Sequence, residues 1–177
     1  MKIRNRASRK GFTLIEILVV VMIIGILASI MVPLAGTASR AAKKRRAMVE
    51  MNAIKIAVME FQRDHKYMPW PGNPKVGDDE WTLDEAAQEA VMDLLTGDNA
   101  MQKSYLQIPE KSRPEGGRLL FVDPWGQFYR VGMDRNMDGS VQVQGGQWAG
   151  ERVSEKVLVY GLGPTDQDEP MKTFDIN

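Results

Sequence analysis

The sequence predicts an α+β protein in which a long N-terminal helix packs on a small C-terminal antiparallel sheet. Two observations favour this fold class. The first third of the chain contains a long apolar run, which is followed by apolar residues at three- and four-residue steps. The last third holds short segments rich in Val, Leu, Phe and Tyr. We expect a second, short helix in the loop that connects them. The 177 residues suffice for one domain with an extension.

The composition limits the chemistry open to the chain. It contains no cysteine and one histidine, which excludes disulfides, thiolate catalysis and cysteine-based zinc sites. Gly-x-Ser-x-Gly, P-loop and paired-histidine motifs are also missing from the sequence. An enzyme is therefore the least favoured class, and we assign no catalytic residue. The basic residues do not form a face interleaved with aromatic ones, so nothing indicates a nucleic-acid partner.

A basic segment, residues 1–11, precedes a run that is almost entirely apolar. The 23 residues from Phe12 to Leu34 would form a helix of roughly 35 Å, which is long enough to span a membrane. Three interpretations fit: a secretory signal peptide cut near residues 35–37, an uncleaved membrane anchor, or a leader removed before the apolar run. Basic residues lie on both sides of the run, so charge does not fix its orientation.

Glu16 is the one ionisable residue between Phe12 and Ser39. A carboxylate in hydrocarbon costs about 2.5–3.5 kcal/mol on insertion scales, so it needs either water or a partner. If the chain is cut between Gly11 and Phe12, the new amine of Phe12 lies one helical turn from Glu16 on the same face. The amine of one subunit could then pair with the carboxylate of another inside a helical bundle.

Helical spacing continues beyond the apolar run. Apolar residues recur at three- and four-residue steps at Ala47, Met51, Ile54, Val58 and Phe61. We therefore expect one helix over about 12–66, apolar all round in its first half and amphipathic in its second. Pro33 lacks an N–H and is expected to kink or locally unwind this helix. His65 is interpreted as a surface or helix-end residue.

Turn and cap signals organise the rest of the chain. Residues 67–81 hold three prolines and two glycines and predict a loop. Thr82 as N-cap and Glu85 three residues later fit a capping box that begins the second helix, and Gly97 can end it. Residues 98–117 are expected to be irregular.

Four strands are expected, at 118–122, 127–133, 140–144 and 156–160. Residues 123–126, Asp-Pro-Trp-Gly, fit a type I turn between the first two. The strands are close in sequence and joined by turns, which favours antiparallel pairing.

The stretch "KGFTLIEILVVVMIIGILASIMVP" resembles the class III leader and first helix of type IV pilins and type II secretion pseudopilins. These proteins have a basic leader ending in Gly, then Phe-Thr-Leu-Ile-Glu, then an apolar helix. The resemblance implies that prepilin peptidase cuts between Gly11 and Phe12 and that Phe12 becomes the N-methylated first residue. It also implies an assembly role for Glu16 and a type IV pilin-like fold.

Three later stretches, "HKYMP", "VDPWGQFYRV" and "VLVYGLGPTDQDEP…FDIN", are similar to the major pseudopilin of type II secretion. Major pseudopilins also lack the disulfide common in type IV pilins. The resemblance implies a cleavable leader at 1–11, a transmembrane and filament-core helix at 12–35, and a periplasmic globular domain at 36–177. It is weak over 70–117, where "WPGNPKVGDDEWTLDEAAQ" looks like an insertion.

The stretch "DRNMDGS" places Asp134, Asn136 and Asp138 at alternating positions before Gly139. This pattern is the first half of an EF-hand loop, in which oxygen ligands surround calcium and the glycine permits a sharp turn. The backbone carbonyl of Ser140 would add a further ligand. The sequence therefore predicts a calcium site here.

The pattern is incomplete, because Gly145 stands where an EF-hand has its glutamate. The missing ligands would come from the acidic loop that contains Asp166 and Asp168. The alternative is a plain hairpin turn at Asp138 and Gly139. The family resemblance favours calcium, since major pseudopilins bind it in the acidic loop near the C-terminus.

The resemblance implies a structural subunit of a type II secretion pseudopilus, single-pass in the inner membrane with its globular domain in the periplasm. Prepilin peptidase would process it, and it would polymerise with itself, with minor pseudopilins and with an inner-membrane assembly platform to help export folded proteins. Two alternatives stay open: a type IV pilus pilin, and a membrane-anchored calcium-binding module that stays monomeric and keeps residues 1–11.

Overall fold

The structure is a computed structural model that describes residues 12–72, 79–114, 116–164 and 170–174, without the side chains of 30–35. The chain divides into two compact units, Met1–Ala42 and Lys43–Asn177, hereafter unit 1 and unit 2. The expected α+β fold class is confirmed, because unit 2 combines helix and antiparallel sheet.

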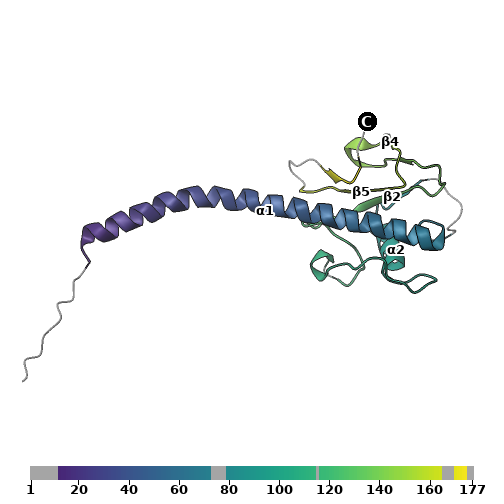
Figure 1. The fold of residues 1–177 in the computed structure, drawn as a ribbon, viewed down its shortest axis with the longest axis horizontal. Helices are drawn as coiled ribbons and strands as arrows, with labels where there is room; N and C mark the ends of the chain where they lie inside the picture. The colour runs from purple at the N-terminus through teal and green to yellow at the C-terminus, as the bar shows by residue number, and fades with distance from the viewer. Residues whose placement is uncertain (1–11, 73–78, 115, 165–169, 175–177) are drawn as a thin grey trace, which may run out of the picture. The chain divides into compact units, whose positions relative to one another are not determined.

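Helix α1 (Leu14–His65) is the longest element and begins in unit 1 (Figure 1). The prediction of one helix over about 12–66 is confirmed to within two residues at its start and one at its end. The helix is continuous through Pro33, so the local unwinding expected there is wrong. A proline removes one backbone donor, and the hydrogen bonds of the neighbouring turns remain.

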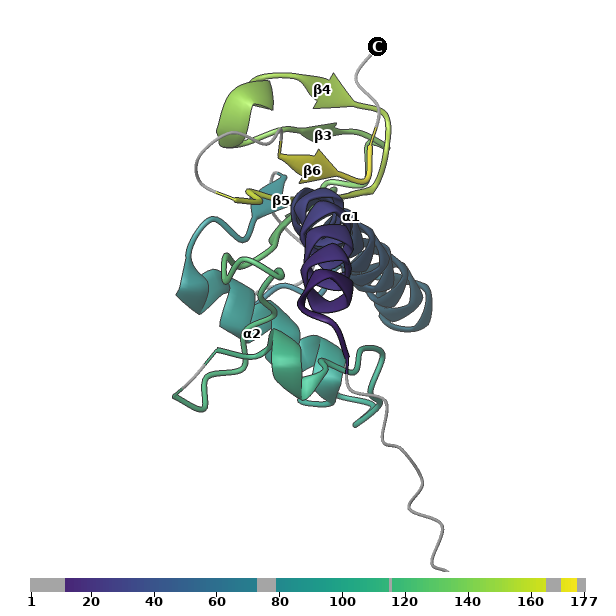
Figure 2. The same cartoon turned by 90° about the vertical axis from the view of Figure 1, so that its left-hand side faces the viewer.

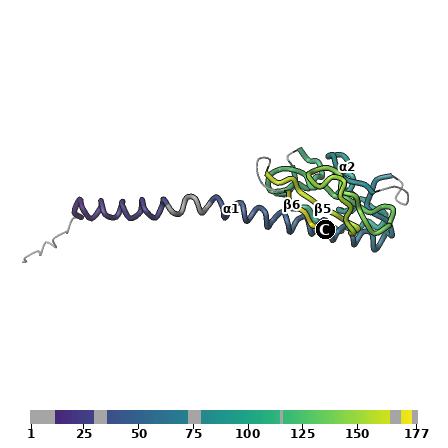
Figure 3. Tube along the Cα trace, turned by 90° about the horizontal axis from the view of Figure 1, so that it is seen from above, coloured from purple at the N-terminus to yellow at the C-terminus, as the bar shows by residue number. Residues whose placement is uncertain are grey.

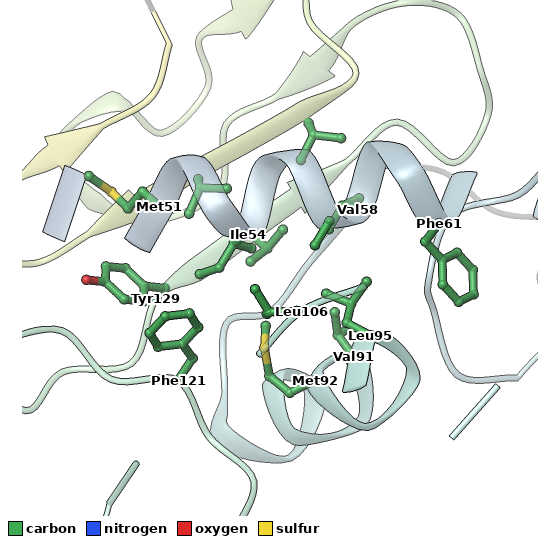
Figure 4. Packing of buried hydrophobic residues seen from close by; sticks show 14 of the residues in the cluster. Met51, Ile54, Val58, Phe61, Val91, Met92, Leu95, Leu106, Phe121 and Tyr129 are labelled. Atoms are coloured by element: carbon green, nitrogen blue, oxygen red, sulfur yellow. The ribbon is translucent and has the colours of Figure 1, made fainter. Parts of the chain in front are cut away.

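In unit 2, α1 buries the predicted apolar stripe. All five of its residues have zero exposed area: Ala47, Met51, Ile54, Val58 and Phe61. They pack against Val91, Met92 and Leu95 of helix α2 (Glu85–Thr96), as Figure 4 shows. The same core contains Val131, Met133 and Val159 from the sheet. One face of α1 therefore holds both α2 and the sheet.

The main sheet has four antiparallel strands in the order β1-β2-β5-β6. They are β1 (Glu80–Trp81), β2 (Arg130–Met133), β5 (Val157–Gly161) and β6 (Met171–Lys172). A separate pair is formed by β3 (Val141–Gln142) and β4 (Arg152–Val153). In Figure 2 the strands and α2 occupy opposite sides of unit 2, with α1 beside them.

Antiparallel pairing is confirmed, and β2, β3 and β5 lie at the predicted strands 127–133, 140–144 and 156–160. The strand predicted at 118–122 is wrong: only Val122 forms a bridge there, with Phe128. Some of its backbone groups have partners outside strand pairing. The N–H of Val122 donates to the carbonyl of Ser112 at 2.8 Å. The carbonyl of Phe121 accepts from the N–H of Tyr129 at 3.2 Å and also from the Gln88 side chain at 2.9 Å.

The capping box predicted at Thr82 is also wrong. Thr82 is fully buried, and its hydroxyl accepts from the N–H of Val131 at 2.8 Å, which extends the pairing of β1 with β2. Asp84 is the N-cap of α2 instead, and its carboxylate accepts from the N–H of Ala87 at 2.8 Å. Gly97 ends α2 as predicted, with a φ of 139° that favours glycine.

Gln88 is a fully buried polar side chain on the core face of α2. Its Nε2 donates to the carbonyls of Phe121 at 2.9 Å and Tyr129 at 3.0 Å, and its Oε1 accepts from the N–H of Phe121 at 3.3 Å. One side-chain amide thus links the backbone of Phe121 to that of Tyr129.

Gln88→Ala is expected to lower the free energy of unfolding by about 2–4 kcal/mol, because each buried backbone group left unpaired costs about 1–3 kcal/mol. Chemical denaturation followed by near-ultraviolet circular dichroism measures this change. Gln144→Ala, which shortens an exposed glutamine, is the control and should change stability by less than about 0.5 kcal/mol. Equal losses in the two variants would contradict the role given to Gln88.

Candidate assembly and metal sites

Glu16 and Thr13 form a reciprocal cap at the start of α1. The Oε2 of Glu16 accepts from both the N–H and the hydroxyl of Thr13 at 2.8 Å, and the Glu16 N–H points back to the Thr13 hydroxyl at 3.3 Å. This is a capping box, which satisfies backbone donors that a helix start otherwise leaves open. The sequence analysis missed it, although Thr-x-x-Glu at 13–16 is its usual signal.

The predicted partner of Glu16 is the amine that Phe12 would gain on cleavage. Gly11 lies outside the described residues, and the Phe12 side chain is 82% exposed. Both bonds from Thr13 fall on Oε2, so in the described part of the chain Oε1 accepts no hydrogen bond. The pairing of Phe12 with Glu16 stays a prediction. The cap uses only Oε2 of Glu16, so Oε1 can still accept a hydrogen bond from the amine.

The first turns of α1 expose a continuous apolar surface. Thirteen large apolar side chains from Phe12 to Leu27 are 46–84% exposed, and they include neighbouring residues on all sides of the helix. An apolar surface of this extent marks a contact with lipid or with protein. Among the helices of the described residues, with 30–35 left out, none is long and apolar enough to cross a membrane.

The residues predicted to bind calcium are brought together in a turn between β2 and β3. Asp134 is fully buried, and its two carboxylate oxygens accept from the N–H groups of Asp138 at 3.1 Å and Gly139 at 2.9 Å. The Asn136 side chain also accepts from the Asp138 N–H at 2.9 Å. Asp138 in turn accepts from the N–H and the hydroxyl of Ser140, both at 2.8 Å.

The alternative of a plain hairpin at Asp138 and Gly139 is wrong. The strands on either side of the turn belong to different sheets, since β2 pairs with β1 and β5 while β3 pairs with β4. The turn therefore carries the chain from one sheet to the other. Its side-chain oxygens, not a strand ladder, hold its shape.

Two residues from outside the predicted motif reach this turn. Arg152 of β4 donates to Asp138 Oδ2 at 3.2 Å and to the Ser140 hydroxyl at 2.9 Å. The hydrogen bonds from Ser140, together with the Arg152 charge, hold the pKa of Asp138 below its usual range. Sequence reasoning missed Arg152 because only the pairing of β3 with β4 places it here.

Asp79 comes from the stretch that resembles an insertion, just before β1. Its Oδ2 accepts from the N–H of Gln142 at 2.9 Å, and its Oδ1 is buried without a hydrogen-bond partner. Burial raises the pKa of Asp79; the bond from Gln142 opposes this rise, and the nearby charges of Asp138 and Asp134 add to it. Asp79 thus adds to this turn a carboxylate that was unforeseen from the sequence.

Asp166 and Asp168 lie outside the described residues. Within the described ranges, no group of three or more His, Cys, Asp or Glu side chains has the arrangement needed to hold a metal ion. His65 is the last residue of α1, as interpreted, and its ring stacks on Phe61 with centroids 4.1 Å apart. The calcium site stays a prediction.

Comparisons with known proteins identify the family of the chain. The model of the prokaryotic N-terminal methylation motif matches residues 6–32. The chain is 31% identical over 126 residues to the type II secretion system core protein G of Pseudomonas aeruginosa, which covers 71% of this chain and 75% of that protein. The chain belongs to the type II secretion system core protein G family. The resemblance seen in the sequence motifs is thereby confirmed.

Other relatives point the same way. Core protein G of Klebsiella michiganensis is 29% identical over 132 residues, covering 72% of this chain and 75% of that protein. A fimbrial protein of Neisseria meningitidis is 38% identical over 65 residues, 37% of each chain. No solved structure is significantly similar. As a member of the core protein G family, the chain has a pseudopilin- or pilin-like role.

Proposed function

We propose that this protein is a structural subunit of a type II secretion pseudopilus. The observation that carries the proposal is the exposed apolar surface of α1 in unit 1, which lies within the match to the methylation motif. A surface of this kind needs an environment that a single chain does not supply. Lipid would provide it before assembly, and the α1 helices of other copies would provide it in the filament.

The steps proposed for the subunit follow from this need. Residues 12–35 span the inner membrane once, with unit 2 in the periplasm. Prepilin peptidase cuts after Gly11 and methylates the amine of Phe12. The processed chain then polymerises with itself and with minor pseudopilins on an inner-membrane platform, and the filament helps to export folded proteins. The methylation motif and the core protein G relatives support these steps.

Free energy favours the filament over water but only weakly over lipid. Burying roughly 500 Å² more apolar area per helix would contribute ~12 kcal/mol relative to water, at about 25 cal/mol per Å². Lipid tails are as apolar as leucine, so packing α1 on other helices gains far less relative to the membrane. Extraction from the membrane therefore requires work from another component, and a specific contact must set the register of the incoming subunit.

The Glu16 carboxylate would supply that contact by pairing with the Phe12 amine of a neighbouring copy. Either charge left unpaired in an apolar bundle is costly, so only the register that pairs them is stable. The capping box explains how Glu16 is held in place before a partner arrives, since Thr13 occupies only Oε2.

A type IV pilus pilin is the second candidate. The match to a fimbrial protein favours it, but that match covers only 37% of this chain. The core protein G matches extend over about twice that share and reach into unit 2. An enzyme has no support, since none of these relatives is named as one.

Mass spectrometry of the protein from membranes should show a chain that begins at Phe12 with a methylated amine. Gly11→Val should leave the longer, uncleaved chain, because the peptidase site has lost its glycine. Gly25→Val is a matched control: it lies inside α1 with open space around it and should be processed normally. Normal processing of Gly11→Val would refute the cleavage site.

Two variants separate the cap from the charge pair at Glu16. Glu16→Gln keeps a side chain suited to the capping box but removes the charge. It should insert in the membrane yet yield at least about tenfold fewer sheared filaments, because the partner amine stays unpaired. Thr13→Ala removes the cap, costs about 0.5–2 kcal/mol of helix stability and should still assemble. The opposite pattern would show that the cap alone matters.

We further propose that Asp134, Asn136, Asp138 and Ser140 bind calcium. Carboxylate and amide oxygens are the ligands that calcium prefers, and Asp79, Asp166 and Asp168 could add to them. The buried Oδ1 of Asp79, which has no hydrogen-bond partner among the described residues, supports this proposal as an oxygen still free to bind a cation.

Calcium at a hundredfold excess over its Kd should raise the melting temperature of the protein by about 5–10 °C, and a chelator should reverse the rise. Asp138→Asn should shrink the shift, whereas Glu110→Gln, an exposed carboxylate on the 3₁₀ helix at Glu110–Ser112, should not. A melt that is the same with calcium and with chelator would contradict the site.

A further inference from the structure

The second half of α1 carries an exposed apolar face as well as its buried one. Met48, Val49, Ile56 and Met59 are 44%, 69%, 57% and 47% exposed. Together with three exposed polar residues they follow one another at helical spacing, so they lie on one side of the helix. This outer stripe consists of Arg45, Met48, Val49, Asn52, Ile56, Met59 and Arg63.

The outer stripe is open to a partner. In Figures 2 and 3 the other elements of unit 2 lie to one side of α1, where its buried residues face the core. Ile56, Met59 and Arg63, with Glu60 beside them, line a shallow hollow of about 350 Å³. Single exposed apolar residues are ordinary on a protein surface, but four on one side of a helix mark a contact.

The composition of the stripe is that of a protein interface. Interfaces are enriched in Met and Arg and depleted in Lys, Glu and Asp, and the stripe contains two Met, two Arg and no carboxylate. Arg63 is 66% exposed, and its Nε lies 3.5 Å from Asp64. The other oxygen of Asp64 already accepts from Lys103 at 2.5 Å and Tyr105 at 3.1 Å. Asp64 therefore does not depend on Arg63 alone, and the exposed guanidinium of Arg63 can also bind a carboxylate of another copy.

A complementary surface lies at the end of α2. Burial raises the pKa of Asp93, and the like charges of Glu89 and Asp98 add to the rise. Arg118 forms an ion pair with Glu89, but in the described part of the chain no basic side chain does so with Asp93 or Asp98. Met101, 53% exposed, follows in the same turn. We call Asp93, Asp98 and Met101 the acidic edge.

We propose that the outer stripe of one copy binds the acidic edge of the next copy along the pseudopilus. The Arg63 end of the stripe, with Ile56 and Met59 beside it, matches carboxylates that lie beside an exposed methionine. The contact joins two different surfaces, and a contact of this kind propagates into a helical filament instead of closing into a dimer. This contact rests on the proposed function. It would fix the position of neighbouring copies through unit 2, in addition to the pairing at Glu16.

Cysteine cross-linking tests the contact directly, because the natural chain contains no cysteine. Met59→Cys and Asp98→Cys copies are co-expressed, and the filaments that they form together are oxidised. These filaments should give disulfide-linked dimers. Each variant alone should stay monomeric, because the contact places residue 59 beside residue 98 of the neighbour. Met59 and Asp98 are exposed, so neither change disturbs the core.

The outcomes separate this contact from the proposed function. Filaments that form without the mixed cross-link overturn the contact, and so do dimers from Met59→Cys alone, which would mean that two stripes face each other. Absence of filaments from the natural chain overturns the proposed function and the contact with it.

Charge reversal gives a second readout. Arg63→Glu should lower the filament fraction at least about fivefold, because it places like charges together, and adding Asp98→Lys should restore assembly. Glu151→Lys, at an exposed site outside both surfaces, is the control. Release of Arg63→Glu from anionic vesicles without any mixed cross-link would assign the stripe to lipid and overturn the contact.

Discussion

The exposed apolar surface of α1 is the constraint on which the rest of the account depends. Thirteen large apolar side chains between Phe12 and Leu27 lie open in a single chain, and each buried square ångström of such surface contributes about 25 cal/mol. No arrangement of unit 1 alone can cover them, because consecutive residues point to every side of the helix. The chain therefore needs lipid or other copies of itself around α1. Assembly is the transfer of α1 from the first environment to the second.

Unit 2 fixes the part of α1 that lies within it. The apolar core contributes most of the contacts, and a buried carboxylate adds directional hydrogen bonds. Glu50 of α1 accepts from Arg46 at 2.8 Å, from Ser112 at 2.7 Å and from the hydroxyl of Tyr129 at 2.7 Å. A buried charge is tolerated only with such partners. These bonds fix the angle of α1 about its own axis, which decides which residues face the core and which form the outer stripe.

Periodicity made the helical part of the fold predictable and left long-range contacts unseen. The stripe from Ala47 to Phe61 and the antiparallel pairing follow from spacing and turn residues alone. The strand predicted at 118–122 is reduced to a single bridge, because the Gln88 side chain binds the Phe121 N–H and the Ser112 carbonyl binds the Val122 N–H. Thr82 is not the cap of α2, because its hydroxyl accepts a hydrogen bond from the N–H of Val131 in β2. Each error is a case in which tertiary partners overrode a local signal.

The candidate sites divide in the same way. The motif residues at 11–16 and 134–140 were readable in the sequence because their spacing is local, whereas Asp79 and Arg152 reach the turn only through strand pairing. The capping box of Thr13 and Glu16 is equally local, since its signal is the Thr-x-x-Glu spacing. The outer stripe needed the structure, since only burial separates the two apolar faces of α1.

The most direct test of the account is the accessibility of α1 in isolated pseudopili that have been sheared from the membrane. A Val20→Cys chain, whose natural residue is 51% exposed in the single chain, is treated with a water-soluble maleimide beside a Glu151→Cys chain. The account predicts that the thiol at position 20 is protected in the filament and reacts after dissociation, while the thiol at position 151 reacts in both. Equal labelling of the two positions in intact filaments would contradict it.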